Sequence, residues 1–81
     1  MLRLITKIKF DSSGVSIGKC HVHKLFKQKG DIVIQNEVLM EIQTDKRIIE
    51  ERSPIKGKLL EYHKSKGSVL NHYDDLYSIE V

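Results

Sequence analysis

Apolar and polar residues alternate over short stretches along most of this chain. Near the start, Leu2, Leu4, Ile8 and Phe10 fall on alternate positions, which is the period of a half-buried β-strand. No window of about eleven residues keeps a helical period. The predicted strands cover residues 2–10, 20–26, 31–34, 37–43, 47–52, 57–62, 68–71 and 75–81. Many short strands separated by turns predict an all-β sandwich or barrel, with eight strands in two small sheets.

The chain also repeats itself. Gly30 and Gly67 lie 37 residues apart, and each follows a Lys-x-Lys triplet. The same offset aligns further residues of like type: Lys27 with Lys64, Lys29 with Lys66, Leu39 with Leu76, Ile42 with Ile79, Val22 with Leu59 and Ile32 with Val69. Two copies are too few for a solenoid. The repeat therefore predicts two halves, related by pseudo-twofold symmetry, that close onto each other.

A polar interruption, Thr44-Asp45-Lys46, separates two of the predicted strands. It lies at the junction between the first and the second half. At the offset of 37 residues, the position that corresponds to Thr44 is Val81, the chain end. We therefore expect Lys46 to protrude from a hairpin at one end of the domain, with both termini at the other end. A lysine in a turn is commonly just a solvated side chain. However, an exposed, modifiable lysine at the end opposite the chain termini is the layout expected of a carrier domain.

The size of the chain favours a function at the surface. We expect its 81 residues to form one domain, 1–81. A chain of this length buries only about 60–65% of the surface that it exposes when unfolded, so its core is thin and leaves little room for an active-site cleft. The longest apolar runs have three residues, as at 32–34, which is too short for a membrane span. The basic first ten residues are interpreted as a strand, and not as a targeting segment.

Cys20 is the only cysteine, which rules out an internal disulfide and fits a reducing compartment. We expect the cytoplasm for a bacterial source and the mitochondrial matrix for a eukaryotic one. With His21 and His23, the cysteine invites a zinc site. However, strand alternation places Cys20 on the opposite face from both histidines, and only the distant His63 and His72 remain as ligands. We therefore expect no metal site, and a Cys20 that is a small buried apolar residue.

The net charge is +3, and lysines are interleaved with acids without a basic block. A small basic β-barrel that binds nucleic acid is therefore an alternative function. Such a domain needs an aromatic face on which bases stack. The aromatic residues are instead spread along the chain, at Phe10, Phe26, Tyr62, Tyr73 and Tyr77. We expect neither nucleic acid nor a membrane as a partner.

Residues 30–59, GDIVIQNEVLMEIQTDKRIIEERSPIKGKL, resemble the lipoyl domain of the dihydrolipoyl acyltransferases in 2-oxo acid dehydrogenase complexes. The motifs that carry the resemblance are, in order, Gly30-Asp31, Leu39, Thr44-Asp45-Lys46, and Ser53-Pro54 with Gly57. Upstream, Gly14, Ser16 and Ile17 are similar to the family's loop beside its modified lysine. The resemblance spans essentially the whole chain.

The resemblance implies a flattened β-barrel of two four-stranded antiparallel sheets. It implies that Lys46 carries lipoic acid in amide linkage, that Thr44 and Asp45 present it to a lipoate ligase or lipoyl transferase, and that Gly14, Ser16 and Ile17 recognise a partner. The implied function is a swinging arm and not an enzyme. A thiamine-dependent 2-oxo acid dehydrogenase acylates the arm, an acyltransferase core passes the acyl group to coenzyme A, and dihydrolipoyl dehydrogenase, a flavoprotein, reoxidises it. The isolated domain is expected to be monomeric.

Two further alternatives share this fold. A biotinyl carrier places methionines on both sides of its lysine, where this chain has Asp45 and Arg47. An unmodified adaptor keeps the barrel without the cofactor. The chain also departs from the family pattern at Gln43, where glutamate is commoner, and at Arg47, Glu51, Cys20 and Tyr73. Of these, Arg47 and Glu51 predict altered packing of the strand over residues 47–52.

Overall fold

The computed structural model describes residues 4–11 and 19–81. These residues form eight strands: β1 (Ile5–Lys9), β2 (Cys20–Leu25), β3 (Ile32–Val33), β4 (Val38–Gln43), β5 (Ile48–Arg52), β6 (Gly57–Tyr62), β7 (Val69–Leu70) and β8 (Asp75–Glu80). The described ranges contain no helix, and hence none that could cross a membrane. The all-β prediction is confirmed, with strands slightly shorter than expected at their ends.

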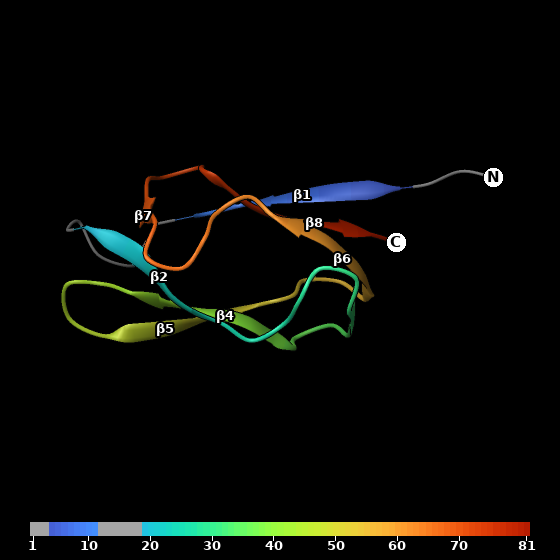
Figure 1. Cartoon of the computed structure of the whole chain (residues 1–81), viewed down its shortest axis with the longest axis horizontal. Coiled ribbons are helices and arrows are strands. Elements are labelled where there is room, and N and C mark those ends of the chain that lie inside the picture. Colours follow the sequence, from blue (N-terminus) through green and yellow to red (C-terminus); the bar gives the residue numbers. More distant parts are fainter. Residues whose placement is uncertain (1–3, 12–18) are drawn as a thin grey trace.

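The strands form two antiparallel sheets of four, in the orders β1-β8-β6-β3 and β5-β4-β2-β7 (Figure 1). Each sheet turns its apolar face inward, where the two faces share one core. The largest fully buried side chains are Tyr77, Leu39, Met40, Ile42, Leu59, Leu76 and Ile79. The expected flattened barrel of two four-stranded sheets is therefore the observed fold.

The predicted repeat is visible in the hydrogen bonds that join the two halves. A turn of each half forms backbone hydrogen bonds with a long strand of the other half, β2 or β6. The two sets of hydrogen bonds correspond at the offset of 37 residues. They are Val22 N to Ser68 O (2.9 Å) and Gly67 N to Val22 O (2.8 Å), against Leu59 N to Asp31 O (2.8 Å) and Gly30 N to Leu59 O (2.7 Å). Gly30 (φ +96°) and Gly67 (φ +88°) adopt the left-handed conformation that these turns require. The halves therefore close onto each other as expected.

The β4–β5 hairpin lies at the opposite end of an elongated molecule from the C-terminus and the start of β1, and the molecule measures 43 × 20 × 20 Å (Figure 1). Figure 1 shows the hairpin at the left and the C-terminus at the right, where β1 also begins. The Val81 backbone N–H donates to the Leu4 carbonyl over 2.9 Å, which ties the first and last described segments together. The hairpin that carries Lys46 therefore lies opposite the C-terminus as predicted (Figure 1), whereas the N-terminal residues 1–3 lie outside the described residues.

Candidate functional site

The hairpin of residues 44–47 is closed by Thr44. The Thr44 side chain is buried, with 4% of its surface exposed. Its hydroxyl accepts hydrogen bonds from the backbone N–H groups of Lys46 (3.2 Å) and Arg47 (3.0 Å) and donates to the Arg47 carbonyl (2.9 Å). The Thr44 N–H donates to the same carbonyl over 2.8 Å. A local network of this kind fixes the backbone of a turn that has no strand partner of its own.

Lys46 lies at the tip of this fixed turn, and its side chain is exposed. Within residues 4–11 and 19–81, no carboxylate forms an ion pair with its ammonium group. Asp45 and Arg47, on either side, are also exposed. The site therefore combines a rigid backbone, held by a buried threonine, with a flexible primary amine in solvent.

Gln43 also supports the hairpin, which sequence analysis did not predict. Its side-chain amide donates to the Thr44 carbonyl at 2.8 Å and to the Arg47 carbonyl at 3.3 Å. The glutamate that is commoner in the family has no N–H to donate when ionised. The departure at Gln43 was visible in the sequence, but its partners are backbone carbonyls that only the folded turn brings within reach.

The other predicted site residues are not all brought together. Gly14, Ser16 and Ile17 lie outside the residues that the structure describes. Cys20 is buried, His21 is half-buried and His23 is exposed, so the cysteine faces away from the histidines as alternation predicts. Among the described residues, no three histidine, cysteine or acidic side chains gather in a way that could hold a metal ion.

The two departures in the strand over residues 47–52 have different outcomes. Arg47 is exposed beside Lys46. Glu51 of β5 is half-buried, and its carboxylate accepts a hydrogen bond from the Tyr77 hydroxyl over 3.1 Å. Burial raises the pKa of Glu51, an effect that the Tyr77 hydrogen bond partly offsets. Burial, together with the nearby Glu51 carboxylate, also raises the pKa of Tyr77. Glu51 of β5 is thus linked to Tyr77 of β8, which belongs to the other sheet. Whether this strand packs differently from that of its relatives stays a prediction.

The aromatic side chains lie at different depths. Phe10 and Tyr77 are buried, and Tyr62 is half-buried with its ring edge toward Tyr77, 6.5 Å between centroids. Phe26 and Tyr73 are exposed. The Lys24 ammonium lies over the Phe26 ring, 5.3 Å from its centroid, and Phe26 remains 45% exposed.

Comparison with known proteins identifies the family to which this chain belongs. The biotin/lipoyl family model, described as "Biotin-requiring enzyme", matches residues 6–79. The succinyltransferase component of the 2-oxoglutarate dehydrogenase complex of Bartonella vinsonii subsp. berkhoffii is 36% identical over 67 residues, which are 83% of this chain and 16% of that protein. The acetyltransferase component of the pyruvate dehydrogenase complex of Bacillus subtilis is 36% identical over 63 residues, 78% of this chain and 14% of that protein.

The lipoamide acyltransferase component of the branched-chain alpha-keto acid dehydrogenase complex of Pseudomonas putida is 32% identical over 74 residues, 91% of this chain. The chain spans only 14% to 18% of the length of these three relatives. Among solved structures, the lipoyl domain of the 2-oxoglutarate dehydrogenase complex from Azotobacter vinelandii matches 93% of this chain and 94% of its own, with a TM-score of 0.70 and 25% identity. The chain therefore belongs to the biotin/lipoyl family, as a lipoyl domain of the acyltransferase components of 2-oxo acid dehydrogenase complexes.

Proposed function

We propose that this lipoyl domain is a swinging-arm acyl carrier whose attachment residue is Lys46. The observation that carries the proposal is the position of Lys46, exposed at the tip of a hairpin that the buried Thr44 holds rigid. A modifying enzyme must find one amine among many lysines. A fixed backbone at the far end of an elongated domain supplies that selectivity.

The chemistry of the hairpin fits a lipoyl amide. Acylation replaces a charged ammonium group by a neutral amide, and no ion pair of Lys46 with the described residues has to be broken. When bound there, the lipoyl group supplies a cyclic disulfide whose five-membered ring cannot reach the preferred dihedral angle and therefore opens readily to accept an acyl group. Thr44 and Gln43 hold the turn, and the domain contributes no acid or base.

The relatives suggest which enzymes the arm visits, because each is a component of a 2-oxo acid dehydrogenase complex. We propose a thiamine-dependent dehydrogenase, an acyltransferase core and dihydrolipoyl dehydrogenase as partners, in a bacterial cytoplasm or a mitochondrial matrix. A tether makes each encounter intramolecular, at effective concentrations of about millimolar. The domain contributes to the rate of such a cycle by carrying the acyl group from one enzyme to the next.

The family model covers biotin as well as lipoate carriers, so the choice of cofactor is part of the proposal. Asp45 and Arg47 stand where the biotinyl carriers place methionines. The three relatives described above are acyltransferase components, which also supports lipoate. An unmodified adaptor barrel gains no support from the geometry, because the hairpin presents the amine freely.

The test is modification of the purified domain. We expect lipoate ligase with ATP and lipoate to add the mass of one lipoyl group, and biotin ligase with biotin to add none. Lys46→Gln should abolish the addition, whereas Lys29→Gln, at another exposed turn lysine, should leave it intact. Equal lipoate uptake by Lys46→Gln and the parent would contradict the assignment, and biotin uptake would select the other cofactor.

A further inference from the structure

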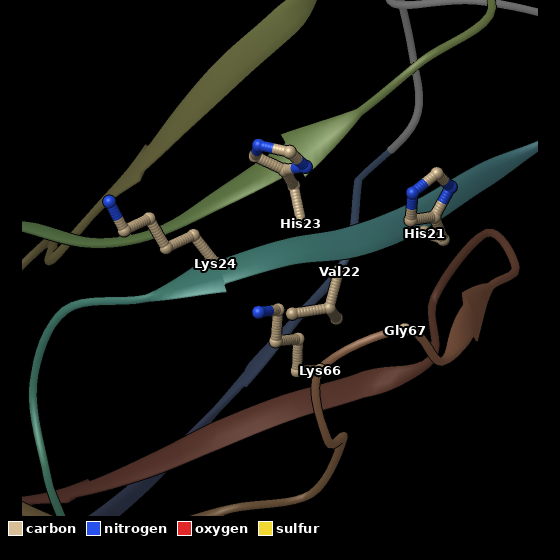
Figure 2. Close-up of a pocket in the computed structure, with 6 residues that line it drawn as sticks. All are labelled: His21, Val22, His23, Lys24, Lys66 and Gly67. Carbon is tan, nitrogen blue, oxygen red and sulfur yellow. The ribbon is translucent and has the colours of Figure 1, made fainter.

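A shallow groove of about 400 Å³ runs beside β2, and its lining residues are His21, Val22, His23, Lys24, Lys66 and Gly67 (Figure 2). The groove exists because β7 is much shorter than β2. The pairs Cys20–Leu70 and His21–Val69 complete the ladder between these strands. Beyond them, Val22 is bonded to the turn at Gly67, and the rest of β2 continues alone on that side.

The polar side chains that line the groove are two lysines and two imidazoles, and none of the described carboxylates contributes to its lining. Lys24 and Lys66 are exposed, and neither forms an ion pair within residues 4–11 and 19–81. Glu41 stands opposite Lys24 in the β2–β4 ladder, but the Lys24 ammonium lies over the Phe26 ring instead. In Figure 2 the ammonium ends of both lysines point toward the left of the view. The groove therefore offers positive charge that the domain itself does not neutralise.

The other half of the barrel shows what the same backbone looks like without this charge pattern. At the offset of 37 residues, His21, His23 and Lys24 correspond to Lys58, Leu60 and Glu61. Glu61 there lies 3.9 Å from the His63 ring nitrogen Nδ1. The equivalent surface also carries two lysines, Lys58 and Lys29, but it adds an acid, Glu61, and an apolar residue, Leu60, so the fold alone does not fix the charge pattern of the groove.

The groove also lies at the end of the molecule that carries Lys46. His21 pairs with Gln43, the last residue of β4 before the hairpin, and Gln43 pairs with Ile48 at the start of β5. The row of His21, Gln43 and Ile48 leads across the sheet from the groove to the hairpin, and Ile48 is exposed. A protein bound in the groove is therefore held next to the arm.

We propose that this groove docks an acidic segment of a partner enzyme that acts on the arm. The inference rests on the proposed carrier function and adds the surface that brings the partner to Lys46. Charge complementarity argues for the acidic segment, since opposite charges steer encounter and fix orientation. A nucleic acid would need aromatic rings on which its bases stack, and no Phe or Tyr side chain of the described residues lines the groove.

The first experiment does not depend on lipoylation. Isotope-labelled, unmodified domain is titrated with an octaglutamate peptide while backbone amide shifts are recorded. We expect shifts at the groove residues that disappear in the double variant Lys24→Glu/Lys66→Glu. The matched control is Lys29→Glu/Lys58→Glu, the same charge change on two exposed lysines of the corresponding surface, where Lys29 and Lys58 stand for Lys66 and His21. This variant should keep the shifts.

Three outcomes of that titration would overturn the docking proposal. They are the absence of shifts at the groove, equal loss of shifts in both double variants, and the same shifts at lower concentration with a single-stranded oligonucleotide or with inorganic phosphate. The last result would assign the groove to a nucleic acid or to a small anion. Both double variants alter exposed side chains, so both should fold.

The second experiment measures function in the lipoylated domain. With the thiamine-dependent dehydrogenase that acylates the parent, Lys24→Glu/Lys66→Glu should raise the KM for the domain by about tenfold, with less effect on kcat. The difference should shrink at high salt, and Lys29→Glu/Lys58→Glu should stay within about twofold of the parent. If the parent is acylated and both variants match it, the docking inference alone fails. If Lys46 takes up no lipoate, the carrier function fails, and the peptide titration still decides the groove.

Discussion

The two halves of the barrel share a backbone framework and differ in the side chains that they expose. In the first half, the Lys27 ammonium pairs with Glu37 at 2.6 Å, and in the second, Lys64 pairs with Asp74 at 3.1 Å. Each carboxylate also accepts a backbone N–H within its turn, from Ile34 and Asn71. The hydrogen bond from Lys27 lowers the pKa of Glu37, and the backbone N–H of Asn71 is the main cause of the lowered pKa of Asp74. The same contacts therefore tie down the corresponding turn in each half.

The halves diverge at the hairpin that carries Lys46. The hairpin of residues 44–47 continues into β5, whereas the corresponding point of the second half is the chain end. Other positions that correspond at the offset of 37 residues and differ are Cys20 and Gly57, Met40 and Tyr77, and Asn36 and Tyr73. Ile8 and Glu51 correspond through the ladders, because Ile8 pairs with Tyr77 and Glu51 pairs with Met40. We expect the contacts that occur in both halves to stabilise the barrel. We expect the positions that differ between the halves to support the hairpin or to affect the local packing. Changes at the unrepeated positions test this division.

Shifting the lysine by one residue should have the largest effect. In Lys46→Ala/Asp45→Lys and Lys46→Ala/Arg47→Lys, the amine stays in the same exposed turn but leaves its tip. We expect the rate of lipoylation to fall by about a hundredfold, since a displacement of a few ångströms takes an amine out of the geometry for attack. Mass spectrometry over time measures the rate, and thermal unfolding shows that the barrel is unchanged. Lipoylation of both variants at the parent's rate would mean that the scaffold does not select the position.

The pair Cys20 and Gly57 should show the next largest difference. A Cβ at Gly57 would lie 2.5 Å from the Glu80 carbonyl oxygen and 2.6 Å from Ile79 Cγ2, whereas Cys20 fits a side chain at the corresponding place in the core. We expect Gly57→Ala to lower the free energy of unfolding by about 3 kcal/mol. As a control, Cys20→Ala should lower it by about 1 kcal/mol. Urea denaturation measures both, and equal values would show that the two sites are packed alike.

Much of this architecture could be predicted from the sequence because it follows from period and repeat. Period and repeat predicted the strands, and the offset between Gly30 and Gly67 predicted a Lys46 hairpin opposite the chain end. Alternation did not predict every buried position, because Leu4 is 64% exposed and four consecutive residues of β8, 76–79, are buried. Other features depend on distances that the sequence does not contain. The bond between Glu51 and Tyr77 crosses between the sheets, and the basic groove exists because β7 ends after two residues. The site residue that sequence analysis missed, Gln43, acts on carbonyls that come within its reach only when the turn closes.

Glu51 should make the stability of the domain depend on pH. Because its pKa is raised in the folded state, the folded protein binds the proton more tightly than the unfolded chain. Stability therefore falls as the pH rises from the carboxyl's ordinary value through the raised one. Glu51→Gln removes the buried charge and keeps an acceptor for the Tyr77 hydroxyl, so it should be more stable than the parent at pH 7.

Urea denaturation across the acid range tests this pH dependence. The gain from Glu51→Gln should vanish once the pH is low enough to protonate Glu51 in both states. Ile8 occupies the corresponding place in the first sheet and carries no charge, so Ile8→Val should shift the whole curve down without changing its shape. If Glu51→Gln raised the free energy of unfolding by the same amount at every pH, ionisation of the Glu51 carboxyl would not destabilise the folded protein.

The turns at Asn36 and Tyr73 should show the smallest effect. Both residues adopt the left-handed conformation, with φ of 71° and 66°. Asparagine tolerates this region, whereas a bulky side chain is strained there, so the second half holds an exposed tyrosine at a conformational cost. Tyr73→Asn should therefore raise the free energy of unfolding by about 0.5–1 kcal/mol, reduced by the lost contact with the His72 ring. Asn36→Tyr, the matched exchange in the first half, should lower it by about 1 kcal/mol. If both substitutions lowered stability, Tyr73 would be held by contacts that outweigh its strain, and this pair of turns would not be equivalent.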